Sequence, residues 1–185
     1  RLHQRAPHID VIAGTYAIPR LPALLENASM GLGTQIDTRR TEDTLFDPDD
    51  LFNSDKSTKH TYPVFVSIMQ GCSKVCSYCV VPSTRGREIC RPSEQIFKEC
   101  VALVHKGYRE VTLIGQNVDS YQYESMDFAD LLKSISRIDG LERIRFTTSH
   151  PQDITPKLID TVAQLPKVCE SFHFPLQAGS NRVLK

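Results

Sequence analysis

The sequence lacks any apolar run long enough to cross a membrane, and it has no excess of charge of either sign. A membrane-spanning helix needs about 20 mostly apolar residues, and the chain also opens without a signal-peptide pattern. Lys and Arg number 22, as do Asp and Glu, so the basic surplus typical of nucleic-acid-binding domains is absent. We expect a cytoplasmic globular protein without a membrane anchor. Any attraction to RNA would come from a local patch or from elsewhere in a longer protein.

A regular set of paired cysteines is absent as well. The six cysteines do not follow the even spacing of a disulfide framework, which favours a reducing compartment. Cys100 lies on the apolar face of a predicted helix, Cys169 opens a predicted strand, and Cys90 falls in a predicted loop. None of these three has a partner at metal-ligand spacing, so we interpret them as structural.

The remaining three cysteines, Cys72, Cys76 and Cys79, follow a C-x3-C-x2-C pattern that lacks a nearby fourth member. A structural zinc site needs four ligands, and most four-iron clusters bind four thiolates. Three thiolates on one short loop leave one iron open, and an open iron can bind a substrate or a cofactor. The pattern therefore favours an iron–sulfur cluster with a free coordination position.

Two other interpretations of the three cysteines exist. They could be buried thiols that pack as small apolar groups. They could also form a zinc site with a distant histidine as fourth ligand. Residues 80–87 contain no second C-x-x-C or H-x3-H half-site of the kind that zinc modules usually show, which argues against zinc. The histidines considered as a fourth ligand are His60, His105 and His173.

Strands and helices alternate in the second part of the chain. Periodicity predicts strands at 62–69, 110–114, 143–148 and 170–176. It predicts intervening helices at 93–106, 128–138 and 155–165, with a further helix opening at Asn181. Ser93 and Asp127 are expected to cap the first two helices, and Pro156 to open the third. Such alternation implies parallel strands joined by right-handed crossovers, so we expect an α/β fold, a truncated (β/α) partial barrel.

The chain before this region is less regular. A short strand at 8–13 and a helix at 19–28 indicate the tail of a small α/β domain, which we place at residues 1–38. Residues 39–61 have no persistent period and are predicted to be a linker. The partial barrel then occupies residues 62–185.

In β/α barrels the chemistry lies at the carboxyl ends of the strands. Here each predicted strand is followed by a polar or glycine-rich loop, and these loops should meet at one edge of the sheet. They are the cysteine loop, Gly115-Gln116-Asn117, residues 148–151 and residues 175–180. We take this edge as the candidate active site.

Several stretches now resemble one family. The cysteine loop with its flanks, residues 65–92, is similar to the methylthiotransferase branch of the radical S-adenosylmethionine (SAM) enzymes, and residues 113–118 agree with it. Residues 143–151 and 173–180 favour the members that act on an isopentenyl-modified adenosine next to the tRNA anticodon. The resemblance covers residues 62–185, and residues 1–28 resemble the tail of the family's N-terminal domain.

The resemblance implies a reaction and its cofactors. SAM bound to a reduced [4Fe-4S] cluster is cleaved to a 5′-deoxyadenosyl radical, which removes hydrogen from carbon 2 of the adenine. Sulfur from a second cluster and a methyl group from another SAM are then added. The partners implied are tRNA and an electron donor such as flavodoxin or ferredoxin.

The family's residues carry over only where motifs match. Cys72, Cys76 and Cys79 match the three cluster ligands. Two arginines of the same loop, Arg85 and Arg87, could bind a phosphate or a carboxylate, or could be solvent-exposed loop residues without a binding role. The residues expected near SAM or substrate are Tyr78, Gly115, Gln116, Asn117, His173 and Gln177.

This sequence also departs from the family. No cysteine precedes Cys72 to supply a second cluster, the C-terminal RNA-binding module is missing, and only four barrel strands are predicted. We therefore expect this chain to be a fragment that does not complete sulfur insertion alone. Two alternatives stay open: a sister enzyme that acts on another tRNA adenosine or on a ribosomal protein, and a non-catalytic metal-binding or RNA-binding module.

Overall fold

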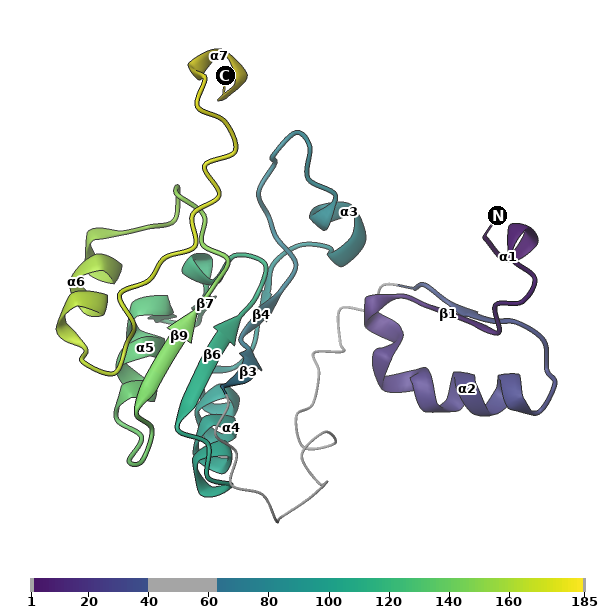
Figure 1. Ribbon diagram of the computed structural model, residues 1–185, viewed down its shortest axis with the longest axis horizontal. Helices are drawn as coiled ribbons and strands as arrows, with labels where there is room; N and C mark the ends of the chain where they lie inside the picture. Colours follow the sequence, from purple (N-terminus) through teal and green to yellow (C-terminus); the bar gives the residue numbers. More distant parts are fainter. Residues whose placement is uncertain (1, 40–62, 185) are drawn as a thin grey trace. The chain divides into compact units, whose positions relative to one another are not determined.

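The computed structural model describes residues 2–39 and 63–184 (Figure 1). The chain forms two compact units, one N-terminal and one C-terminal, which are described separately. The predicted linker at 39–61 lies outside the described residues apart from Arg39, so its irregular character stays a prediction, as do the proposed domain limits. Among the described residues, no helix combines the length and the apolar character needed to cross a bilayer.

The N-terminal unit is built around one β-α-β crossover. Strands β1 (Val11–Ala13) and β2 (Gln35–Asp37) pair in parallel, and α2 (Leu21–Ser29) connects them after the 3-10 helix η1 (Thr15–Arg20). The predicted helix at 19–28 is thus divided, with Pro19 in the 3-10 turn and Pro22 in the first turn of α2, where its missing N–H costs nothing. A single helical turn, α1 (Leu2–Arg5), precedes them.

The C-terminal unit has a three-stranded parallel sheet in the order β3-β6-β9. These strands are Val64–Ser67, Glu110–Ile114 and Arg143–Phe146, and all three arrows run the same way in Figure 1. Helices α4 (Ser93–His105) and α5 (Phe128–Ser136) are the crossovers, and α6 (Pro156–Gln164) packs on α5. The smaller elements are β4 (Met69–Gln70), α3 (Val81–Arg85), β5 (Ile89–Cys90), η3 (Val118–Ser120), β7 (Gln122–Tyr123), β8 (Met126–Asp127) and α7 (Asn181–Leu184). The predicted α/β class with parallel strands and crossover helices is confirmed.

One face of the sheet forms the core. The strand register brings Val66 beside Leu113 and Leu113 beside Phe146, and all three are buried. Phe65 and Arg145, one residue out of phase, lie on the opposite, exposed face. This alternation follows from the two-residue period of a strand, which sends successive side chains to opposite faces.

Two of the expected helix starts are confirmed and one is wrong. The Asp127 carboxylate accepts a hydrogen bond from the Asp130 N–H (2.9 Å) at the start of α5. Pro156 opens α6, whose N-cap Thr155 accepts from the Leu158 N–H (3.1 Å). Ser93, by contrast, is the first residue inside α4, and Pro92 occupies the N-cap without a side-chain bond.

The predicted strand at 62–69 changes partner within its length. At Ile68 the N–H still bonds to the Ile114 carbonyl (3.0 Å), but the Ile68 carbonyl accepts from the Arg91 N–H (2.9 Å). The chain then continues as β4, which pairs antiparallel with β5 instead of with β6. This also places Cys90 in a short strand, where a loop was expected.

The fourth predicted strand, 170–176, does not form. Pairing with β9 is limited to one bridge between Ile144 and Val168. The Ser171 N–H instead donates to the Cys169 carbonyl (2.8 Å), so it cannot pair with β9. Pro175 has no N–H that could form a strand hydrogen bond. The segment still runs beside β9, because the Ser149 N–H reaches the His173 carbonyl (3.3 Å) and the Phe172 ring meets the Phe146 ring edge-on.

Candidate functional site

The cysteine loop projects from the carboxyl ends of β3 and β4 and is closed at its base. Pairing of β4 with β5 brings Gln70 beside Ile89, and the Cys72 N–H donates to the Gly86 carbonyl (3.2 Å). Figure 1 shows the loop, with α3 on it, at the same end of the sheet as the loops that follow β6 and β9. The placement expected from the sequence is therefore found.

Glycine is required at the first residue of this loop. Gly71 has φ of 79°, in the left-handed region, and a Cβ there would collide with the carbonyl of Arg87. Its N–H donates to Gln116 Oε1 (2.6 Å). The loop after β6 thus fixes the start of the cysteine loop.

The three thiols share one loop and interact electrostatically. Cys72 is buried, while Cys76 and Cys79 are half-buried. Burial raises the pKa of the Cys72 thiol, the Lys74 N–H opposes that shift, and the charges of Glu88, Cys79 and Cys76 add to it. Three thiolates so close together repel one another, and bound cations would relieve that repulsion.

Among the described residues, no three His, Cys, Asp or Glu side chains converge closely enough to hold a single metal ion. A four-iron cluster binds its thiolates on different irons, so its ligands need not converge on one point. The loop itself carries three thiols and no fourth ligand, which fits that group; His150 of a neighbouring loop lies 3.9 Å from Cys76 Sγ but completes no site for a single ion among the described residues. His105 is at the end of α4, just before β6 begins, and so lies at the opposite edge of the sheet from the loop.

The loop after β9 contacts the cysteine loop directly. Lys74 Nζ donates to Asp153 Oδ1 (2.6 Å), and Cys76 Sγ lies 3.9 Å from His150 Nε2. The other oxygen of Asp153 accepts from Asn117 Nδ2 (2.6 Å). One carboxylate therefore connects the loops that follow β3, β6 and β9.

A buried acid lies beneath these loops. Asp119 accepts from Ser149 Oγ (3.1 Å) through Oδ1, while its Oδ2 and the Oδ1 of Asn117 are buried without a partner among the described residues. Burial raises the pKa of Asp119 to about 6, against the hydrogen bonds from Ser149 and the His150 N–H. Two buried acceptors without a partner are unusual in a folded protein and mark this junction as a candidate site.

The other predicted cofactor residues are distributed unevenly. Gly115, Gln116 and Asn117 lie at the junction of the loops, and a Cβ at Gly115 would collide with the Met69 side chain. His173 reaches the junction through its backbone carbonyl, with its ring exposed. Tyr78 and Gln177 are also exposed, and Gln177 has φ of 65°.

Several residues at this junction were missed from the sequence. Asp119, Ser149, His150 and Asp153 were not singled out, although residues 148–151 were recognised as a strand-end loop. Their partners are distant in sequence, so no local spacing indicates them. The one available signal was the density of polar residues directly after β6 and β9.

The three cysteines interpreted as structural differ in burial and in contacts. Cys100 is fully buried, and burial raises the pKa of its thiol to about 12. Cys90 Sγ accepts from the Gln122 N–H (3.4 Å), and Cys169 donates its N–H to the Ile144 carbonyl (2.9 Å). That none of the three binds the cluster stays a prediction.

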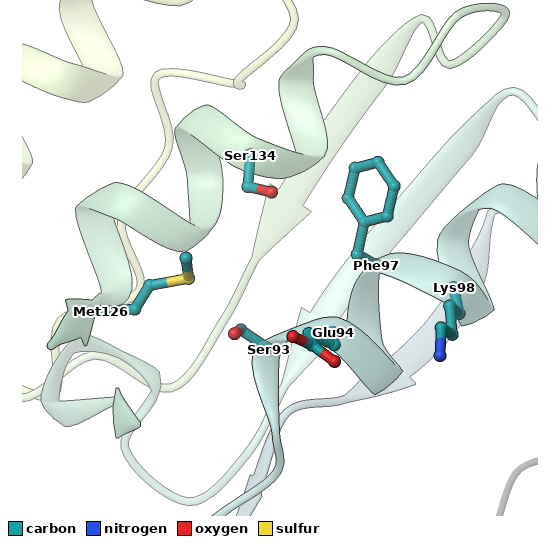
Figure 2. Close-up of a pocket in the computed structure, with 6 residues that line it drawn as sticks. All are labelled: Ser93, Glu94, Phe97, Lys98, Met126 and Ser134. Atoms are coloured by element: carbon teal, nitrogen blue, oxygen red, sulfur yellow. The ribbon is translucent and has the colours of Figure 1, made fainter. Parts of the chain in front are cut away.

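A pocket of about 310 Å³ lies away from this junction, between α4 and α5 (Figure 2). None of the predicted site residues lines it, and no thiol or histidine does. The pocket-lining residues are Ser93, Glu94, Phe97, Lys98, Met126 and Ser134. Nothing in it suits the chemistry that the cysteine loop indicates.

Comparison with known proteins gives the family. The family model of the Radical SAM superfamily matches residues 66–185, which include the whole cysteine loop and every strand-end loop described above. The chain belongs to the radical SAM superfamily. The expected resemblance is thereby confirmed at the level of the superfamily, and with it the choice of an iron–sulfur and SAM enzyme over a zinc module.

Curated relatives of this radical SAM chain carry a more specific name. Proteins named tRNA-2-methylthio-N(6)-dimethylallyladenosine synthase are similar to it: one from Protochlamydia amoebophila is 46% identical and one from Desulfitobacterium hafniense is 44% identical. Each match covers 100% of this chain and 41% of the relative. The chain thus spans about two fifths of the length of the curated relatives it matches.

A solved structure supports the fold. The radical S-adenosylmethionine methyltransferase TsrM from Kitasatospora setae superposes with a TM-score of 0.54 at 18% identity, over 66% of this chain and 23% of that one. At that identity the likeness concerns the fold alone.

Proposed function

We propose that this chain is part of a tRNA methylthiotransferase that adds sulfur and a methyl group at carbon 2 of an isopentenyl-modified (dimethylallyl) adenosine. The observation that carries the proposal is the three-thiol loop, closed at its base and joined to the other strand-end loops by Gln116 and Asp153. The names of relatives at 44–46% identity along the full chain support the substrate.

Cys72, Cys76 and Cys79 hold the [4Fe-4S] cluster in this proposal, and SAM occupies the open iron. When bound, the two cofactors supply the radical chemistry, and the protein orients them and excludes competing reactions. The residues proposed to line SAM and substrate are Tyr78, Gly115, Gln116, Asn117, His173 and Gln177. A tRNA, a flavodoxin or ferredoxin as electron donor, and a cytoplasmic location belong to the same proposal.

The test compares the full-length protein with this chain. Hypomodified tRNA is incubated with reductant, SAM and either protein, and its nucleosides are analysed by mass spectrometry. We expect the methylthiolated nucleoside from the full-length protein only, because this chain has no cysteine before Cys72 for a second cluster. Methylthiolation of a different adenosine or of a ribosomal protein would point to a sister enzyme.

Cluster assembly is tested on the chain itself after anaerobic reconstitution with iron and sulfide. Cys72→Ala should lose most of the bound iron and the visible absorption band. A variant with Cys90→Ser, Cys100→Ala and Cys169→Ser serves as the matched control and should keep both. Unchanged iron in Cys72→Ala, or zinc bound in preference to iron by the wild type, would contradict the proposal.

A further inference from the structure

His150 lies at the edge of the cysteine loop, and hydrogen bonds hold both its backbone and its ring. Its backbone carbonyl accepts a hydrogen bond from the Asp153 N–H (2.9 Å). The ring atom Nδ1 accepts from the Gln152 N–H (3.2 Å). Backbone and ring are therefore both fixed by groups of the same structured loop.

The bond from Gln152 determines the tautomer. An Nδ1 that accepts a hydrogen bond carries no proton, so in the neutral ring the proton lies on Nε2. Nε2 is the atom that lies 3.9 Å from Cys76 Sγ. The ring therefore presents an N–H donor to this sulfur, at the long end of the distances found for hydrogen bonds to sulfur.

The position of the ring is supported from the other side as well. Lys74, two residues before Cys76, pairs with Asp153 at 2.6 Å, and both side chains are largely buried. This ion pair holds the cysteine loop against the loop that carries His150. The contact between His150 and Cys76 is thus set by two loops that are fixed to each other independently of it.

We infer that His150 donates an N–H···S hydrogen bond to the Cys76 thiolate and thereby raises the reduction potential of the cluster. Hydrogen bonds to the sulfurs are one of the means by which a protein sets the potential of an iron–sulfur cluster. The direction follows from charge, because a donor stabilises the more negative, reduced state more than the oxidised state. The inference makes His150 a positioning and tuning residue, and it rests on the proposed function only in that Cys76 binds the cluster.

The experiment is a potentiometric titration of the reconstituted chain, followed by electron paramagnetic resonance, with iron and sulfide measured for each sample. His150→Leu should keep the cluster and move its midpoint to a more negative potential. His150→Gln, which retains a donor near the position of Nε2, should shift it less. His105→Leu, the same change at the far edge of the sheet, is the matched control and should leave the potential unchanged.

A second measurement needs no variant. The wild-type chain is grown with 15N-histidine, and its reduced cluster is examined by pulsed electron paramagnetic resonance in H₂O and D₂O. We expect a weak nitrogen coupling and an exchangeable proton, both too weakly coupled for a directly ligated imidazole. Absence of either signal would overturn the inference even if His150→Leu failed to fold.

The outcomes separate this inference from the proposed function. A wild-type chain that assembles no cluster contradicts the proposed function. A cluster that assembles in His150→Leu with an unchanged potential overturns the inference and leaves the proposed function intact. Loss of iron from a folded His150→Leu also overturns it, because His150 would then be a ligand.

Discussion

At the scale of single residues, the cysteine loop depends most on Gly71. Its positive φ is costly for any residue with a side chain, and its missing Cβ leaves room for the Arg87 carbonyl. The obstacle is a backbone atom, which cannot rotate away as the end of a flexible side chain can. The glycine is thus needed for both conformation and space.

Gly71→Ala should therefore lower the free energy of unfolding by about 3 kcal/mol or more, since left-handed strain alone costs about 1–3 kcal/mol and the steric clash adds to it. Gly107→Ala is the matched control, because Gly107 has φ of 97° but no neighbouring atom within 4 Å of the place that a Cβ would take. We expect a loss of about 1–2 kcal/mol there. Urea unfolding of both variants measures the difference, and equal losses would contradict the steric argument.

At the scale of elements, the loop after β9 is the support of the cysteine loop. Asp153 connects it to Lys74 and to Asn117, and Asn117 is almost fully buried. Thr148, at the start of this loop, has φ of 73°, which is unusual for a β-branched residue. Such strain persists only where the surrounding contacts fix the backbone.

Asp153→Ala should reduce the free energy of unfolding by about 2–3 kcal/mol, because it leaves the Lys74 ammonium and the Asn117 amide without their acceptor. Lys157→Ala is the matched control. Lys157 pairs with Asp127 and Asp130 on the exposed surface of the helices, where ion pairs contribute less than about 1 kcal/mol. Equal effects in denaturant unfolding would show that the Asp153 contacts add nothing beyond a surface pair.

How far the sequence predicts the elements depends on where their contacts lie. Strand β6 and helices α4, α5 and α6 were predicted within one or two residues, because their patterns and most of their stop signals are local. The sequence did not predict the change of strand partner at Ile68, because it depends on the distant Arg91 N–H. It also did not predict that 170–176 forms no strand, because that depends on how few hydrogen bonds the segment makes with β9.

The same distinction applies to the candidate site. The three thiols and the Gly115-Gln116-Asn117 loop were found from the sequence, since each is a compact motif behind a strand. The sequence did not point to Asp119, Asp153 or His150, since each contacts a partner residue 30 to 79 positions away in the chain. A sequence motif indicates candidate chemical groups more readily than it indicates the groups that hold them in place.

At the scale of the whole molecule, carboxyl groups with shifted pKa values make stability depend on pH. Hydrogen bonds from Arg39 and Arg20 lower the pKa of Asp37, and one from Arg143 lowers that of Glu110. These ionised carboxylates stabilise the fold at pH values above their ordinary pKa, and that stability is lost as the pH falls. Asp119 acts in the opposite direction.

Because the pKa of Asp119 rises from 3.8 to about 6 on folding, the folded state holds a proton that the unfolded state releases between these values. Stability from this group is therefore present below pH 4 and is lost as pH rises to 6. The unfolding free energy of the wild type, minus that of Asp119→Asn, should fall by about 1–3 kcal/mol over this window. Asp160→Asn, on the exposed side of α6, is the control. A flat difference for Asp119→Asn would contradict the raised pKa.

The close approach of Gly115 to Met69 has a consequence for how this sequence can vary. The Met69 side chain fills the space that a Cβ at position 115 would need, so neither position is free to change alone toward a larger residue. An alanine at 115 becomes acceptable only when position 69 shrinks at the same time. We expect the two positions to covary among relatives, although 45 residues separate one from the other.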